Sequence, residues 1–426
     1  MQNFYLIDFL KKTGKLSPEL LSCLRFDLNQ NIYYYGNQFK YPSEANFQKS
    51  LKSNIRKILK RLFIRYKIFQ NKSIPTNKKL ILSNAYFTVN QELKELNYHV
   101  YCPSWSMSAD RNVLSDFKLF TSSEKIKDKI QSCNFNELIS SEFLSELKKF
   151  EEELKLFFEK IKLNALFVPN DAGFFESMAI HVCKQINVPS FVFLHGLPGR
   201  YNNIDDNKAD YLIVWGEKIK EHYIDVGINP DKIFVSGHPY YKGFKQEELK
   251  FSLNNILIIT KAMPGSQHSD KVRLNDRGNS VLYLYAIEEV LKRMGVKSVR
   301  FRPHPSESSE WYLKFINKEF YKADTDSLKD SIEKSSLVIG PTSTVFLESI
   351  YYGINYVVFE PSVNDIDLIN YELVPPFDGT KAEVPVAKNE QELEYILKNK
   401  TKVNASFFSE YIKTPFDLSF INKLIK

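Results

Sequence analysis

Cysteine is scarce in this chain of 426 residues, and the few that are present lie far apart. Cys23, Cys102, Cys133 and Cys183 form no CxxC pair, the spacing typical of zinc sites and redox-active dithiols. A disulfide framework or a cysteine-based metal site is therefore not expected, and the sequence predicts a protein of the reducing cytoplasm.

Three further signals are missing. No apolar stretch approaches the roughly 20 residues that cross a bilayer. The first residues lack the basic start and apolar core of a secretion signal, so export is not expected. No GxGxxG sequence is present, and the main fingerprint of a dinucleotide-dependent oxidoreductase is therefore absent.

Acidic residues are missing from one segment. Lysine and arginine number 58 against 51 aspartates and glutamates, which gives a net charge of +7. Between Lys49 and Lys72 there are nine basic residues and no acidic one, whereas the rest of the chain is close to neutral. A general nucleic-acid surface is not expected, and no nucleic acid is predicted as a partner. With 43% hydrophobic and 26% charged residues, the composition is that of a globular protein.

From Lys78 onward, short apolar runs alternate with charged stretches of helical period, which predicts α/β domains with parallel sheets. Residues 1–75 form an N-terminal helical extension, 76–240 a first Rossmann-like domain and 241–426 a second. Two such domains facing a cleft make the GT-B arrangement. The expected strands are Leu80–Ser83, His99–Tyr101, Ala165–Pro169, Phe191–Leu194, Tyr211–Trp215, Ile233–Ser236, Ile256–Thr260, Ser298–Phe301, Leu337–Ile339 and Tyr356–Phe359.

Two motifs at strand ends of the second domain indicate a phosphate site. Arg302-Pro303-His304-Pro305 follows one strand, and Gly340-Pro341-Thr342-Ser343-Thr344 follows another and opens an amphipathic helix. Hydroxyls and free N–H groups at a helix start bind anions, and ligands of open α/β sheets bind at the carboxyl ends of strands. A turn-bound histidine and an ordinary helix cap are the simpler alternatives. The expected ligands of a nucleotide phosphate are Arg302, His304, Thr342, Ser343 and Thr344, with Glu348 accepting ribose hydroxyls.

Two strand ends of the first domain offer a general base for an acceptor hydroxyl. Asp171 lies in Asn170-Asp171-Ala172-Gly173, where a carboxylate and a glycine follow a predicted strand. His195-Gly196 follows the next strand, and His195 is the alternative base, or a proton donor to the leaving group. An N-cap aspartate at a βα turn explains Asp171 equally well.

Two other motifs are interpreted as structural. His238-Pro239 lies at the junction between the domains, where a hinge role is favoured over a chemical one. Asp324-Thr325-Asp326 has the form of a metal-binding DxD. Asp326 directly precedes the expected helix Ser327–Lys334, however, and is interpreted as its cap. No metal is predicted.

A basic amphipathic helix is predicted between Leu51 and Phe69. In one interpretation its apolar face docks on the protein and its basic side is solvated. In the other the helix lies on a membrane surface and prefers anionic lipid. The sequence leaves both alternatives open. The apolar face consists of Leu51, Ile55, Ile58, Leu59, Leu62, Phe63, Tyr66 and Phe69.

The Arg-Pro-His-Pro and Thr-Ser-Thr pair resembles the HP and S/T motifs of bacterial sialyltransferases and polysialyltransferases, GT-B enzymes that use CMP-activated nonulosonic acids. The chain is also similar to the CDP-glycerol glycerophosphotransferases, which pair an HG motif, here His195-Gly196, with RPHP and a later Ser/Thr motif. Capsular Kdo transferases are a looser likeness, and Gly237-His238-Pro239 resembles the hinge of UDP-GlcNAc 2-epimerases.

The resemblance implies that His304, Ser343 and Thr344 hold the phosphate of a cytidine nucleotide, and that Asp171 is the base. The segment Asn170-Asp171-Ala172-Gly173 differs from the acidic-acidic-glycine base motif of the sialyltransferases, because it has one carboxylate instead of two and an inserted alanine before the glycine.

The expected function is an inverting, metal-independent glycosyltransferase without a cofactor, which builds a bacterial surface polysaccharide such as capsule or lipopolysaccharide. The donor is a CMP-linked sugar of the sialic, Kdo or pseudaminic type, and the acceptor is a glycan or lipid-linked hydroxyl. The enzyme is expected in the cytoplasm, with Leu51–Phe69 bringing it to the inner membrane. The alternatives are polyol-phosphate transfer from a CDP donor, UDP-sugar 2-epimerisation and a non-catalytic GT-B scaffold.

Overall fold

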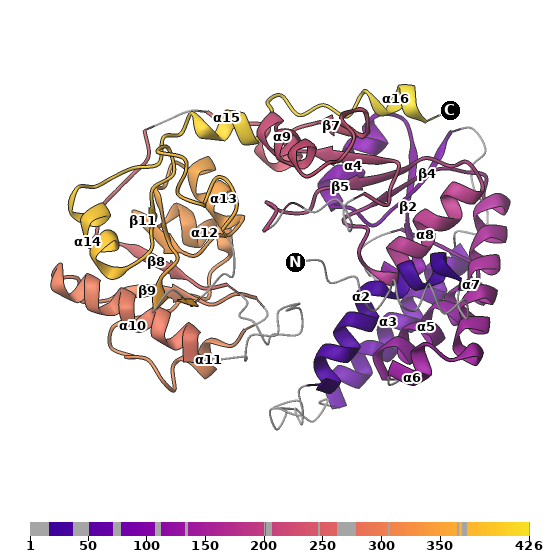
Figure 1. Cartoon of the computed structure of the whole chain (residues 1–426), viewed down its shortest axis with the longest axis horizontal. Helices are drawn as coiled ribbons and strands as arrows, with labels where there is room; N and C mark the ends of the chain where they lie inside the picture. The colour runs from indigo at the N-terminus through magenta and orange to yellow at the C-terminus, as the bar shows by residue number, and fades with distance from the viewer. Residues whose placement is uncertain are drawn as a thin grey trace.

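The computed structural model describes residues 17–36, 51–70, 78–106, 112–132, 135–199, 201, 207–245, 248–261, 278–305, 307–363, 366–368 and 373–425. Across these residues the chain forms two parallel sheets, each flanked by helices (Figure 1). The predicted pair of Rossmann-like α/β domains is therefore confirmed. No helix in the described part of the chain is both long enough and apolar enough to span a bilayer.

The N-terminal domain contains a sheet in the order β3-β2-β1-β4-β5-β6-β7, with every neighbouring pair parallel. Its strands are β1 (Leu80–Ser83), β2 (His99–Pro103), β3 (Val113–Leu114), β4 (Leu163–Val168), β5 (Ser190–Phe193), β6 (Tyr211–Val214) and β7 (Ile233–Val235). The connecting helices include α4 (Phe87–Glu95), α5 (Phe117–Ser132), α6 (Phe135–Leu138), α7 (Ser141–Lys160), α8 (Phe174–Gln185) and α9 (Glu217–Asp225).

The C-terminal domain has the sheet order β10-β9-β8-β11-β12-β15. Its strands are β8 (Ile256–Ile259), β9 (Val299–Arg302), β10 (Tyr321–Ala323), β11 (Leu337–Gly340), β12 (Tyr356–Phe359) and β15 (Val386–Ala387); β13 (Ser362–Val363) and β14 (Ile366–Asp367) form a separate antiparallel pair. Its helices are α10 (Gly278–Arg293), α11 (Ser309–Tyr312), α12 (Leu328–Glu333), α13 (Val345–Tyr351) and α14 (Glu390–Lys398).

Strand β8 is apolar along its whole length because both faces of its sheet are covered. Ile256 and Ile258 pack with helices α10 and α14, whereas Leu257 and Ile259 join a cluster that continues into the N-terminal domain. Side chains of a strand alternate between the two faces of a sheet, so one uninterrupted apolar run supplies both layers.

The end of the chain returns to the N-terminal domain, which differs from the predicted boundaries. Helices α15 (Phe407–Tyr411) and α16 (Ile421–Leu424) run from the C-terminal domain along the edge of the other one (Figure 1). The N–H of Lys413 donates to the carbonyl of Trp215 over 2.7 Å, and the N–H of Asp417 donates to that of Ser236 over 2.8 Å. The second domain is therefore not a continuous 241–426 unit.

Within the predicted N-terminal extension, helix α2 (Pro18–Gly36) is part of the N-terminal domain. Its residues Leu21, Leu24 and Leu28 are fully buried and join the core cluster that contains α7 and α8. An amphipathic helix gains most of its stability from such burial, so this segment is an integral layer of the domain.

Candidate nucleotide and acceptor site

Four neighbouring strands of the C-terminal sheet end at one edge and carry polar residues there. Strand β8 lies between β9 and β11, and β12 is the next strand beyond β11. The residues that follow these strands are Thr260 and Lys261, His304, Thr342 to Thr344, and Glu360. The two predicted motifs are therefore brought to the same edge, as parallel topology requires.

The main chain at His304 is fixed to strand β8. Its N–H donates to Oγ1 of Thr260 over 3.0 Å, and the Thr260 hydroxyl donates to Oε2 of Glu307 over 2.8 Å. The N–H of Glu307 donates back to the carbonyl of His304 over 2.8 Å. This closed set of hydrogen bonds places the half-buried imidazole at the strand end. Its contact with a phosphate stays a prediction.

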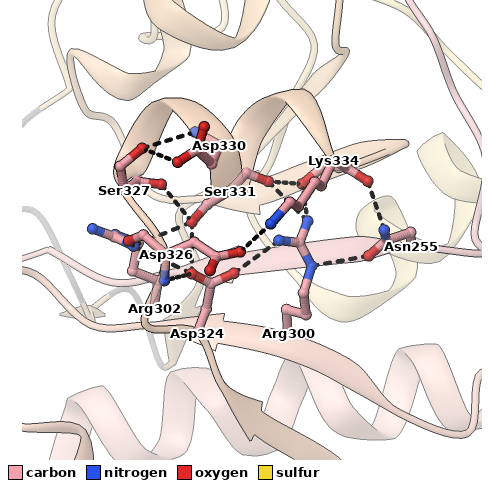
Figure 2. A network of polar contacts seen from close by, with 10 residues as sticks. Asn255, Arg300, Arg302, Asp324, Asp326, Ser327, Asp330, Ser331 and Lys334 are labelled. Atoms are coloured by element: carbon pink, nitrogen blue, oxygen red, sulfur yellow. Dashed lines mark hydrogen bonds and ion pairs between the residues drawn. The ribbon is translucent and has the colours of Figure 1, made fainter.

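Arg302 lies in a different environment from the one predicted. Nη1 of Arg302 is 3.2 Å from Oδ1 of Asp324, 2.6 Å from the carbonyl of Asp326 and 3.2 Å from Oγ of Ser331 (Figure 2). Arg300, on the same face of β9, pairs with the other oxygen of Asp324 at 2.8 Å. The geometry favours a structural role for Arg302, in tying β9 to α12, over the predicted contact with the nucleotide.

The Asp324-Thr325-Asp326 segment belongs to the same network. The side chain of Asp324 is almost inaccessible and pairs with two guanidinium groups, and the carboxylate of Asp326 lies 2.7 Å from Nζ of Lys334 (Figure 2). The helix cap is Ser327, whose Oγ accepts the N–H of Asp330, so the predicted cap at Asp326 is wrong by one residue. A divalent cation at either carboxylate would have to displace these basic partners.

Lys261 and Glu360 were not predicted from the sequence, and both contact Thr342. Oε1 of Glu360 accepts the N–H of Thr342 over 2.6 Å and its hydroxyl over 2.8 Å. Nζ of Lys261 donates to the same hydroxyl over 3.3 Å. Burial lowers the pKa of Lys261, and the charge of Glu360 opposes that shift. Since the Thr342 proton is directed to Glu360, its hydroxyl orients the turn, and Ser343 and Thr344 are the better candidates for phosphate ligands.

Ser343 and Thr344 are half-buried at the start of α13. Oγ of Ser343 accepts the N–H of Val345 over 3.3 Å, whereas the side chain of the N-cap Thr344 caps no N–H of the helix. Helix α13 has only 7 residues, so its dipole is small. Any anion here is therefore bound by side-chain hydroxyls and local N–H groups.

The first domain presents His195 and Gly196 opposite this turn. A Cβ added to Gly196 would lie 3.3 Å from Oγ1 of Thr344, so the two domains approach each other here. The side chain of His195 is exposed, and its Nδ1 lies 3.0 Å from the carbonyl oxygen of Pro169. A carbonyl oxygen only accepts, so Nδ1 carries a proton, and in the neutral imidazole Nε2 then keeps the lone pair. That tautomer can act as a base.

The geometry disfavours the predicted role of Asp171 as the base. Its side chain is fully buried, and Oδ2 accepts the N–H groups of Lys208 at 2.7 Å and Ala209 at 3.4 Å. Oδ1 of Asn170 accepts the N–H groups of Ala172 and Gly173, each at 3.2 Å. Asp171 is not a helix N-cap either, because the N-cap of α8 is Gly173 and the Asp171 carboxylate accepts N–H groups from residues beyond β5. Its burial favours a structural role, and an acceptor hydroxyl does not reach this carboxylate.

Glu348 lies on α13 at the boundary between the domains. Burial raises its pKa to about 7. Burial also raises the pKa of Tyr86 to about 12, with a further contribution from the charge of Glu348. Close by, the hydroxyls of Tyr240 and Tyr352 hydrogen-bond across the boundary. Glu348 therefore lies among tyrosines of both domains, and its predicted contact with a ribose stays a prediction.

His238 follows strand β7, next to the junction between the domains. Its ring is buried against Trp215, with ring centroids 4.6 Å apart, and its Nδ1 accepts the N–H of Tyr240 over 3.2 Å. Burial lowers its pKa to about 4, so the imidazole is neutral at pH 7. These contacts fit a structural element at the domain junction and favour the predicted hinge over a chemical role.

A carboxylate that the sequence interpretation missed lies at the topological switch point of the first sheet. There β1 is flanked by β2 on one side and β4 on the other, and ligands commonly bind at such a position. Nδ2 of Asn84, just after β1, donates to Oε1 of Glu176 over 2.8 Å. Burial raises the pKa of the Glu176 carboxyl. Asn84 could have been found as a polar residue at a strand end, whereas nothing in the sequence distinguishes Glu176 from other helical glutamates.

No protein-family model and no curated protein matches the chain. Among solved structures, it is similar to S. aureus MnaA in a co-structure with UDP, with 11% identity, a TM-score of 0.48, and coverage of 81% of this chain and 94% of that one. The Neisseria meningitidis UDP-GlcNAc 2-epimerase bound to UDP-GlcNAc has 13% identity, a TM-score of 0.44 and coverage of 81% and 97%. Acinetobacter baumannii MurG has 12% identity, a TM-score of 0.43 and coverage of 82% and 99%. These likenesses concern the fold alone.

Proposed function

We propose that this chain is an inverting glycosyltransferase that transfers a nonulosonic-type sugar from a CMP-activated donor to a glycan or glycolipid hydroxyl of a bacterial surface polysaccharide. The observation that carries the proposal is the approach of Gly196 to Thr344, which sets an exposed histidine with a free Nε2 opposite a turn of hydroxyl residues. The donor class rests on the likeness of His304 and Ser343-Thr344 to the HP and S/T motifs.

In this mechanism each domain has one task. Nε2 of His195 takes the proton of the acceptor hydroxyl as its oxygen attacks the anomeric carbon. The bond from that carbon to the phosphate oxygen breaks, and CMP leaves with the electron pair. The hydroxyls of Ser343 and Thr344 and the imidazole of His304 stabilise the charge that develops on the phosphate. Attack opposite the leaving group inverts the anomeric centre.

A second candidate is polyol-phosphate transfer from a CDP donor, and the accessibility of His195 favours it. The likeness to CDP-glycerol glycerophosphotransferases rests on the His195-Gly196 pair, and that pair faces Thr344 across the domain boundary. In this reaction the acceptor oxygen attacks phosphorus and CMP again leaves, so the same residues serve. The two candidates differ in the bond broken, C–O or P–O. They also differ in the nucleotide part of the donor, which is CMP in the first reaction and CDP in the second.

Nucleotide binding separates the candidates. The full chain is heated with CMP, CDP, UDP or GDP, and unfolding is followed for the parent, His304→Ala and Ser343→Ala. A ligand at about 100 times its Kd stabilises the folded state by about 2.7 kcal/mol, a readily measured shift. The variants His181→Ala, on α8 where the ring contacts Glu151 of α7, and Ser409→Ala, on α15, are the matched controls.

A shift that is largest with CMP and is lost only in the site variants is the expected result. A preference for CDP supports the second candidate. A preference for UDP replaces both with a UDP-sugar reaction, epimerisation included, and no shift with any nucleotide overturns the nucleotide site.

A further inference from the structure

Helix α3 (Leu51–Gln70) docks on the N-terminal domain with a face other than the predicted one. Ile64 and Ile68 are buried against Val113 of β3 and Phe120 of α5. Nε of Arg61 lies 2.6 Å from Oε2 of Glu124 on α5, which fixes the rotation of the helix about its axis. The orientation of α3 is therefore defined by both apolar and ionic contacts.

The opposite face of α3 is apolar and exposed. A helix turns by about 100° per residue, so the side chains on this face occupy one continuous arc along three turns. Isolated exposed apolar residues are normal, as at Leu156 or Tyr395, but a continuous patch on one helix marks an interaction surface. The residues of this arc are Ile58, Leu59, Leu62, Phe63, Tyr66 and Phe69, each between 38% and 59% exposed.

Basic residues border the exposed arc on both sides. By helical rotation, Arg61 and Arg65 lie along one border and Lys67 along the other. Arg65 is exposed, and Nζ of Lys67 lies 5.6 Å from the ring centre of Phe63. The helix sequence contains no acidic residue at all.

We propose that this face of α3 binds a lipid bilayer that carries anionic headgroups, with the helix lying in the membrane plane. The apolar side chains insert at the boundary of the acyl chains, and the side chains of Arg65 and Lys67 meet lipid phosphates, whereas Arg61 remains paired with Glu124. The charge pattern favours a lipid surface over a second copy of the chain as the binding partner. A second copy of the same face would set basic borders against one another, whereas a negative surface complements them. The helix lies at the end of the N-terminal domain away from α15 and α16 (Figure 1).

The test is sedimentation of the full chain with vesicles of phosphatidylcholine alone or mixed with phosphatidylglycerol. The parent is expected to pellet with the mixed vesicles and to be released by salt. Leu62→Ser with Phe69→Ser weakens partitioning by at least about tenfold, because two inserted side chains are lost. Leu156→Ser with Tyr395→Ser, at exposed apolar sites on other helices, leaves partitioning unchanged.

The contribution of the basic side chains to lipid binding is tested with a second pair of double variants. Arg65→Gln with Lys67→Gln lowers partitioning into the mixed vesicles by about tenfold or more, since each charge contributes roughly 1 kcal/mol near an anionic surface. Lys148→Gln with Lys149→Gln, on exposed positions of α7, is the charge-matched control and has no such effect.

Three results would overturn the proposal: no sedimentation of the parent, equal sedimentation of the Leu62/Phe69 variant, or a dimer in solution that this variant dissociates. Unfolding curves with and without nucleotide show whether each variant is folded and whether its nucleotide site is intact. Because lipid binding and nucleotide binding are measured separately, failure of one proposal is distinguishable from failure of the other.

Discussion

At the scale of single residues, two polar side chains that look alike in the sequence have opposite environments. His195 and Asp171 both follow a strand of the first sheet. The imidazole is exposed and oriented by the carbonyl of Pro169, whereas the carboxylate is buried under the N–H groups of Lys208 and Ala209. Those N–H groups lie 37 and 38 residues further along the chain, so no local pattern could have distinguished a base from a structural acid.

Substitution of these two residues is expected to separate catalysis from stability. His195→Gln lowers kcat by about 10²–10⁴-fold, the usual contribution of a general base, and leaves the unfolding temperature close to that of the parent. Asp171→Ala lowers the free energy of unfolding by about 1–3 kcal/mol, since buried N–H groups lose their acceptor. Turnover and chemical denaturation measure the two effects. Full activity of His195→Gln would exclude it as the base.

Glu348 is expected to give stability a pH dependence. Its pKa is raised from an ordinary value of 4.5 to about 7, so the folded state binds more protons than the unfolded state between these values. The free energy of unfolding therefore falls as the pH rises through this window, by up to about 3 kcal/mol relative to Glu348→Gln. Denaturation of both proteins between pH 4 and about 8 checks this. Parallel curves would show that Glu348 is solvated.

At the scale of elements, long periodic segments and the edge strand β7 were predictable, whereas three other short edge strands were not. The interior strands β1, β8, β11 and β12 appear as uninterrupted apolar runs, because helices cover both faces. The edge strands β3, β10 and β15 have only two or three residues and show no period. For α3 the pattern predicted a helix but not its docked face, because that depends on the partners Val113 and Phe120.

The network that joins β9, β10 and α12 is expected to hold the strand end at His304. Asp324→Ala removes the buried carboxylate shared by Arg300 and Arg302, and lowers the free energy of unfolding by roughly 3 kcal/mol. Asp326→Asn, which breaks only an exposed pair with Lys334, is the matched control and changes stability little. Chemical denaturation measures both. Equal stability of the two variants would show that the network is not structural.

At the scale of the whole molecule, the fold class and the strand-end motifs were predictable, but the approach of Gly196 to Thr344 between the domains was not. Topology alone brings His304 and Thr342–Thr344 to one edge. The approach of Gly196 to Thr344 depends on the orientation of one sheet relative to the other, which no segment of the sequence encodes by itself.

A side chain at Gly196 is expected to interfere with this approach. Gly196→Val places methyl groups against Thr344 and lowers turnover by about tenfold or more, because small misplacements at a reacting centre have large effects on rate. A Cβ at Gly199 meets nothing within 4 Å, so Gly199→Val leaves turnover unchanged. Steady-state kinetics compares the turnover of the two variants, and thermal unfolding shows whether each of them is folded. Normal turnover of Gly196→Val would place the reaction elsewhere.

The return of the chain through α15 and α16 affects the order in which the protein is completed during synthesis. The ring of Phe420 stacks on Phe234 of the edge strand β7, with ring centroids 4.9 Å apart, and Nζ of Lys79 reaches the carbonyl of Ile425 at 2.9 Å. The N-terminal domain leaves the ribosome first. It therefore lacks these C-terminal contacts until the whole second domain has been translated. Until they arrive, Phe234 lacks this packing partner, and apolar surface exposed on a partly synthesised chain is open to association with other chains.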